Sequence, residues 1–136
     1  MAKGLDKYQE RLNIVSGFGK NLARRSKSKC ELCEASGVKL SVFEVPPVKE
    51  EPNYDRCIFL CESCIELLKN IKKSKENDFR FLSGSMWSEV AIVKVTALYI
   101  LNNIKDKYSW AEELLENAYL DEDGKELLKA IDFEIK

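Results

Sequence analysis

Two Cys-x-x-Cys pairs constrain this chain more than any other feature of its sequence. Cys30 and Cys33 form the first pair, Cys61 and Cys64 form the second, and the 27 residues 34–60 separate them. Each pair can fold into a knuckle that presents two sulfur atoms at adjacent corners of a tetrahedron, so two pairs complete a four-cysteine site. We predict one structural Zn²⁺ per chain, bound by these four thiolates.

The alternative to a metal site is a group of four buried or redox-active thiols. A thioredoxin-like redox motif uses one such pair within a βαβ unit, whereas this chain carries two pairs. The N-terminal segment is polar and has no apolar signal core, so we expect a cytoplasmic protein. In that reducing compartment, thiols at this spacing bind metal more often than they form disulfides.

Histidine is absent from the chain, which excludes His-containing triads and His-ligated catalytic zinc. An all-cysteine site also leaves no coordination position open for water or substrate. We therefore expect a structural metal and a protein that is not an enzyme. No catalytic role is expected for the acidic residues among the cysteines or on the adjoining hairpin, which are Glu31, Glu34, Glu44, Asp55 and Glu62.

The fifth cysteine, Cys57, stands outside the two pairs. If the segment 57–61 is extended, Cys57 and Cys61 share a face, so its thiol could lie near the metal. Free cysteine is most often a small buried hydrophobe, and we expect that role here. A substitute ligand or a redox sensor is the alternative.

Apolar periodicity predicts an amphipathic helix over 5–16, which we expect Gly17 and Gly19 to interrupt. Segments 38–45 and 56–61 have the composition of strands, and a hairpin pairs them most economically. A helix should follow from Cys64, with one apolar face. That face is formed by Cys64, Leu67, Leu68 and Ile71.

The second half of the chain is predicted to be mostly helical. We expect a loop over 73–85 with a short strand at 79–82, and then a central buried helix within 89–104, capped by Ser85 or Ser88. Because 89–104 is rich in β-branched residues, a strand is the alternative there. A capping box of Ser109 and Glu112 should start a helix to about residue 120. The acidic segment 121–124 should break it before a short last helix, whose inward residues are Leu127, Leu128 and Ile131.

These elements predict an α+β protein. Residues 1–29 form an N-terminal helix and basic arm, 30–75 a four-cysteine zinc module, and 76–136 a helical C-terminal region that packs on the zinc module as one unit. The first pair precedes a hairpin and the second sits where a strand enters a helix. That layout favours a treble clef over a zinc ribbon.

Charge is distributed unevenly along the chain. The net charge is −1, but residues 1–29 carry eight basic and two acidic residues, whereas 106–136 carry four and ten. Basic residues beside the cysteines make nucleic acid a candidate partner. The low pI of about 5.7 and the absence of interleaved aromatic residues favour a solvated face instead. No membrane partner is expected. The candidate phosphate-binding residues are Lys20, Arg24, Arg25, Lys27, Lys29, Lys69, Lys72 and Lys73.

Several segments together resemble the PhnA-like family of bacterial proteins. They are the two cysteine pairs, "LSVFEVPP" at 40–47, "SMWSEV" at 85–90 and "YLDEDG" at 119–124. The resemblance implies a zinc-binding N-terminal region of the treble-clef or ribbon type. The family's name is associated with alkylphosphonate utilisation, so the resemblance also implies, as an alternative function, an enzyme or accessory factor in alkylphosphonate metabolism.

The hairpin also resembles the treble clef of HNH nucleases, in which a "LxVHHI" strand carries the catalytic histidine. Phe43 and Glu44 occupy the histidine positions here. If the scaffold is shared, the nuclease centre is missing, which leaves a nucleic-acid-binding finger as a further alternative.

The leading prediction is a non-catalytic zinc protein that binds another macromolecule. The basic arm and the region 85–89 are the candidate contact surfaces. We expect Trp87, Phe79 and Phe81 to belong to the core rather than to a ligand site. A pocket into which Arg80, Trp87 and Glu89 point would instead indicate a small-molecule ligand.

Overall fold

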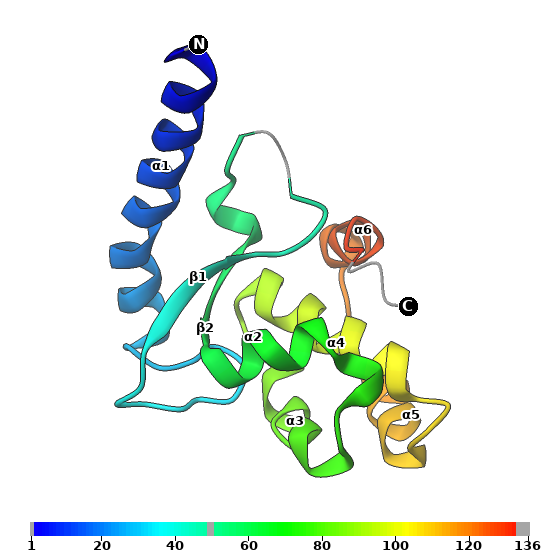
Figure 1. Ribbon diagram of the computed structural model, residues 1–136. Helices are drawn as coiled ribbons and strands as arrows, with labels where there is room; N and C mark the ends of the chain where they lie inside the picture. The colour runs from blue at the N-terminus through cyan, green and yellow to red at the C-terminus, as the bar shows by residue number, and fades with distance from the viewer. Residues whose placement is uncertain (1, 49–50, 133–136) are drawn as a thin grey trace.

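The computed structural model describes residues 2–48 and 51–132, with side chains from residue 7 onward. It combines helices with one two-stranded antiparallel sheet (Figure 1). This confirms the expected mixture of helix and a small sheet. The elements are α1 (Ala2–Ser26), β1 (Leu40–Glu44), β2 (Cys57–Cys61), α2 (Glu62–Lys69), α3 (Leu82–Ser85), α4 (Ala91–Ile104), α5 (Ser109–Glu116) and α6 (Glu122–Lys129), with short 3₁₀ helices η1 (Tyr54–Arg56), η2 (Ile71–Lys73) and η3 (Glu76–Phe79).

The hairpin forms as predicted. Leu40 pairs with Cys61 at one end of the sheet and Glu44 pairs with Cys57 at the other. The metal-site end of β2 leads directly into α2, which begins at Glu62. The sheet therefore places the second cysteine pair beside the chain segment that enters β1.

Helix α1 does not stop at Gly17, so the predicted interruption is wrong. It continues to Ser26 because its second half packs on the hairpin, where Leu22 is fully buried. A glycine within a helix costs about 1 kcal/mol, which such packing offsets. The helix ends where Lys27 and Ser28 take φ of 58° and 59°, and the Ser28 amide donates to the Ala23 carbonyl at 2.8 Å.

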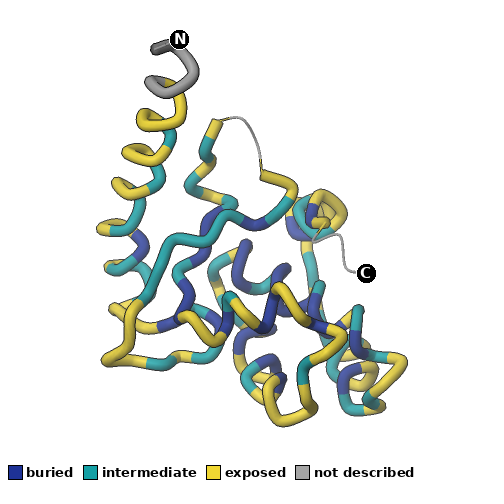
Figure 2. Tube along the Cα trace, in the orientation of Figure 1, coloured by how far each residue is buried: buried dark blue, intermediate teal, exposed yellow. Residues whose placement is uncertain are grey.

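Helix α4 is the centre of the C-terminal half, as predicted. Its buried side chains occur on every side of the helix, and Ile100 and Leu101 are both fully buried. Helices α3, α5 and α6 and the turn η2 all pack against it. Figure 2 shows buried positions along α4 and β2, whereas the outer face of α1 is exposed.

Five local predictions in this half are wrong. Residues 79–82 form no strand and belong to η3 and α3. The N-cap position of α4 is occupied by Val90, which makes no side-chain cap bond, and Ser88 instead accepts a hydrogen bond from the Val90 amide. Helix α5 starts without a capping box and ends at Glu116. The segment 121–124 starts a helix rather than only ending one, because the Asp121 carboxylate caps α6 by accepting from the Gly124 amide at 2.7 Å.

One cluster of buried residues joins the cysteine region to the C-terminal helices. It includes Cys30 and Leu32 from the first knuckle, Cys64 from α2, Val93 from α4 and Ile131 after α6. Leu127 and Leu128 pack against this cluster as expected. Among the helices in the described ranges, none has both the length and the apolar character needed to cross a bilayer.

Candidate metal centre

The structure brings together the four cysteines that the sequence pairs. The sulfur atoms of Cys30, Cys33, Cys61 and Cys64 all lie within 4.8 Å of one another. The Sγ–Sγ distance is 3.6 Å between Cys30 and Cys64, and also 3.6 Å between Cys33 and Cys61. A zinc ion with four Zn–S bonds of about 2.3 Å requires S–S distances of about 3.8 Å. The observed cluster has the size of a tetrahedral zinc site.

The first knuckle is shaped by backbone hydrogen bonds. The Cys30 amide donates to the Ala35 carbonyl at 2.9 Å, and the Glu34 amide donates to the Cys30 carbonyl at 2.8 Å. Glu34 adopts the left-handed region with φ of 65°, which reverses the chain directly after Cys33. These bonds turn both sulfur atoms of the pair toward the same side.

The second pair lies where β2 passes into α2. Cys61 is the last residue of the strand and the N-cap of the helix, and Cys64 lies in its first turn. The positive end of the helix dipole favours negative charge at this position. The strand-to-helix junction expected from the sequence is therefore present.

Without a cation, the four neighbouring thiols do not all ionise, because the pKa values of Cys33 and Cys64 are raised. A hydrogen bond shared with Cys64 lowers the pKa of Cys30 to about 4, and the same bond raises the pKa of Cys64. Burial raises the pKa of Cys33 to about 11. Four neighbouring thiolates in this setting need a cation, and a soft four-sulfur set of this size fits Zn²⁺.

An ion pair fixes the first knuckle to α1. The Arg25 guanidinium donates two hydrogen bonds to the Glu31 carboxylate, from Nε to Oε2 at 2.9 Å and from Nη2 to Oε1 at 2.7 Å. The side chains are 19% and 4% exposed, so the pair is largely removed from water. Arg25 also donates to the Cys57 carbonyl at 2.9 Å and lies over the Tyr54 ring.

Glu31 connects this ion pair to β2. The Phe59 amide donates to the Glu31 carboxylate at 2.8 Å, and the Glu31 amide donates to the Phe59 carbonyl at 2.8 Å. Glu31 follows Cys30 directly, and Phe59 lies two residues before Cys61. We call Arg25, Glu31 and the Phe59 backbone the knuckle clamp, since they hold the two cysteine pairs in register. No sequence pattern indicates this clamp, because only the turn at Lys27 and Ser28 brings its charges together.

Cys57 lies at the far end of β2 from the cluster. It pairs with Glu44, whereas Cys61 pairs with Leu40, and four residues of strand span about 13 Å. Its side chain is buried, and Sγ donates to the Asn53 carbonyl at 3.3 Å. Burial raises its pKa to about 11. The expectation of a buried hydrophobe fits this position, and the sulfur lies outside the four-cysteine cluster.

We predict that Cys57 does not react with iodoacetamide in the folded protein near neutral pH. The thiolate is the reactive form, and both burial and the raised pKa keep it protonated. Alkylation followed by mass spectrometry should find Cys57 unmodified, whereas all five cysteines should be modified in denaturant with a chelator. Rapid modification of Cys57 in the folded protein would contradict its buried placement and would favour the interpretation of Cys57 as a redox sensor.

The predicted basic residues lie on two separate segments of the chain. Arg25 forms the ion pair of the knuckle clamp, so we no longer count it among the candidate phosphate-binding residues. The first group lies on α1 and the turn after it, whereas Lys69 ends α2 and the remaining two lysines lie on η2. Nucleic-acid binding stays a prediction that rests on the exposed members, which are Lys20, Arg24, Lys27, Lys29, Lys69, Lys72 and Lys73.

The aromatic residues divide between core and surface. Phe79 is fully buried and Phe81 is half-buried against the core, as expected. Trp87 is 52% exposed, so its predicted core role is wrong; Leu82 and Met86 fill the core beside it. Arg80 and Trp87 line one pocket together, but Glu89 is not among its lining residues.

The carboxylates of the region have structural or solvent-exposed positions. Glu44, in a position corresponding to the HNH histidines, receives two hydrogen bonds from Arg11 at 2.6 and 2.7 Å. Glu34, Asp55 and Glu62 are exposed. The pairing gives Glu44 a role in fixing α1 to the hairpin.

Comparisons with known proteins give no identification of this arrangement. No family model matches the chain, no curated protein is similar to it, and no solved structure matches it. The resemblance to the PhnA-like family therefore stays a prediction, and the four-cysteine cluster is the feature from which function is inferred.

Proposed function

We propose that this protein is a non-catalytic interaction module whose shape is maintained by one structural Zn²⁺ bound to Cys30, Cys33, Cys61 and Cys64. The observation that carries the proposal is the sulfur cluster, with all four atoms within 4.8 Å. When bound, the ion offsets part of the negative charge of the thiolates and links the two knuckles. A closed four-sulfur site has no position for a substrate, which favours a scaffold over catalysis.

The arrangement of elements supports a treble-clef module. The first knuckle leads into β1, β2 returns antiparallel to it, and the second knuckle lies at the start of α2. The C-terminal helices share a core with this unit, which gives the module a rigid base. A four-thiolate zinc site requires reduced cysteines, which favours a cytoplasmic location. The alternative role in alkylphosphonate metabolism is supported by the family resemblance alone.

Metal analysis tests the proposal. Protein purified without chelator should contain one zinc per chain by mass spectrometry under native conditions. A variant with Cys33→Ser and Cys64→Ser should contain none. Metal-free wild-type protein in which both knuckles stay ordered with four free thiols would contradict the proposal and favour the interpretation as buried thiols.

A further inference from the structure

Two depressions in the surface meet beside the metal centre. The larger has a volume of about 600 Å³ and the smaller about 370 Å³. Both are lined by Cys33 and Phe81, so they adjoin at the half-exposed cysteine of the first knuckle. We call them together the knuckle groove, with an acidic lobe and a tryptophan lobe.

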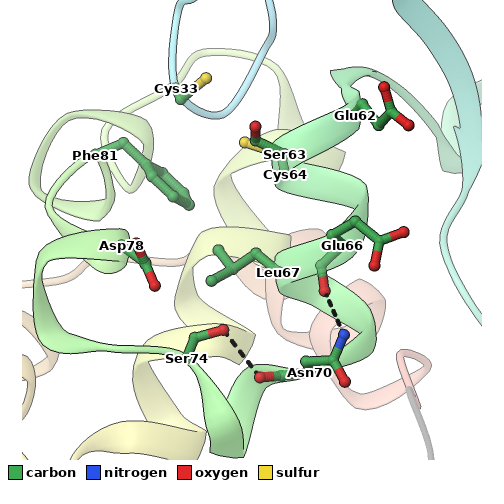
Figure 3. Close-up of a pocket in the computed structure, with 10 residues that line it drawn as sticks. All are labelled: Cys33, Glu62, Ser63, Cys64, Glu66, Leu67, Asn70, Ser74, Asp78 and Phe81. Carbon is green, nitrogen blue, oxygen red and sulfur yellow. Dashed lines mark hydrogen bonds between the residues drawn. The ribbon is translucent and has the colours of Figure 1, made fainter.

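The acidic lobe combines apolar walls with carboxylates. Figure 3 shows Phe81 and Leu67 pointing toward each other across it, with Asp78 on the Phe81 side. Glu62 and Glu66 lie on α2 and line the lobe at its edge, and Figure 3 shows their carboxylates directed away from Phe81 and Asp78. No basic side chain is among the described residues that line this lobe. An aliphatic stem with a cationic end fits such a surface, since the stem contacts apolar atoms and the end meets the carboxylates.

The tryptophan lobe offers an anchoring surface with little net charge. Trp87 is one of the large apolar side chains that are exposed. The charged residues that line this lobe are Arg80, Glu34 and Glu31, and Arg25 compensates the charge of Glu31. An exposed tryptophan in a concave site is typical of contact surfaces that bind an aromatic or apolar side chain.

We propose that the knuckle groove binds a peptide segment of a partner protein in which a Lys or Arg lies close to an aromatic residue. The cation would enter the acidic lobe and the ring would pack on Trp87. The inference rests on the proposed function, because the metal holds Cys33 and the first knuckle at the junction of the lobes. Four thiolates around a dication also add a charge of about −2 there.

Charge favours a peptide over nucleic acid in this groove. Glu34, Glu62, Glu66 and Asp78 line the two lobes, against Arg80 as their one free basic lining residue among those described. Phosphate groups would be repelled by this balance, whereas a cationic segment would be attracted. The exposed residues of the basic arm lie on α1 and the turn that follows it, so they do not line the groove.

The test measures binding of three labelled synthetic peptides of equal length to the zinc-loaded full chain by fluorescence polarisation. One peptide carries Lys next to Trp, one carries Glu next to Trp, and one carries Lys next to Gly. We expect the Lys-Trp peptide to bind at least about tenfold more tightly than either of the others. A single-stranded oligonucleotide serves as the competing probe.

Paired variants assign each preference to its lobe. Glu62→Gln with Glu66→Gln should remove the preference for Lys over Glu, and Trp87→Ala should remove the preference for Trp over Gly. All three residues are exposed, so folding should be unchanged. Glu116→Gln and Tyr119→Ala, at exposed sites on and after α5, are the matched controls and should change neither preference.

Any one of three results would overturn the peptide proposal. They are equal binding of the three peptides, effective competition by the oligonucleotide, and an equal loss of either preference in the control variants. Zinc content is measured on the same samples. One zinc per chain without peptide discrimination would refute the groove alone, whereas loss of zinc binding in wild-type protein would refute the proposed function.

Discussion

Replacement of Cys61 by Ser is expected to abolish stoichiometric zinc binding and to lower the free energy of unfolding by about 3 kcal/mol or more. Cys61 lies in the cluster at 3.6 Å from Cys33, and it also joins β2 to α2. Its loss leaves three sulfur ligands, which weakens the link between the knuckles. Zinc competition with a chromophoric chelator and denaturant unfolding measure the two effects.

The loss of structure that follows the loss of zinc should at first be confined to the region around the first knuckle. Amide hydrogen exchange should become fast at Cys30 and Glu31, whose amides are bonded within and beside the first knuckle. The α4 amides should stay protected, because that helix is buried among α3, α5 and α6. Chelator treatment of wild-type protein should give the same pattern.

Cys57→Ser is the matched control for this experiment. It makes the same chemical change in a buried cysteine of the same strand, but outside the sulfur cluster. It should retain one zinc per chain with an unchanged affinity. Equal loss of zinc in the two variants would contradict the assignment of the ligands.

Breaking the knuckle clamp should have the second largest effect. Arg25→Met leaves the Glu31 carboxylate buried without its counter-charge, and breaking such a pair typically costs about 3–5 kcal/mol. Arg25 is 19% exposed, so we expect the lower end of that range. Because Glu31 adjoins Cys30, zinc affinity should also fall by about 10- to 100-fold. Denaturant unfolding and zinc competition measure the changes.

Two further variants show whether the clamp acts through the paired charges. Adding Glu31→Gln to Arg25→Met removes the unpaired charge, so the double variant should be more stable than Arg25→Met alone. Arg11→Met breaks the other ion pair between α1 and the hairpin, with Glu44, and should leave zinc affinity unchanged. Equal effects of Arg11→Met and Arg25→Met on zinc would refute a specific role for the clamp.

The metal site could be predicted from the sequence because its chemistry is local. Each Cys-x-x-Cys pair forms its own turn, and the hairpin and α2 follow from short-range patterns between them. The central helix α4 was predictable for a related reason. Its apolar residues are too many for one face, which indicates burial on all sides.

Features that depend on distant contacts were not predictable. Glycine at 17 and 19 indicated a helix end, but packing of Leu22 on the hairpin carries α1 to Ser26. Trp87 looked like a core residue, yet it follows the four-residue helix α3, which has no periodicity to show that Met86 points inward and Trp87 outward. The knuckle clamp depends on two non-glycine residues with positive φ, for which the sequence has no clear signal.

X-ray absorption spectroscopy at the zinc edge tests the central claim most directly. Protein purified without chelator should contain one zinc per chain, with four sulfur neighbours at about 2.3 Å and no nitrogen or oxygen shell. The spectrum should be unchanged in Cys57→Ser, whereas Cys61→Ser should retain no stoichiometric zinc to measure. Absence of zinc, or a wild-type spectrum with fewer than four sulfur ligands, would contradict a closed structural centre formed by Cys30, Cys33, Cys61 and Cys64.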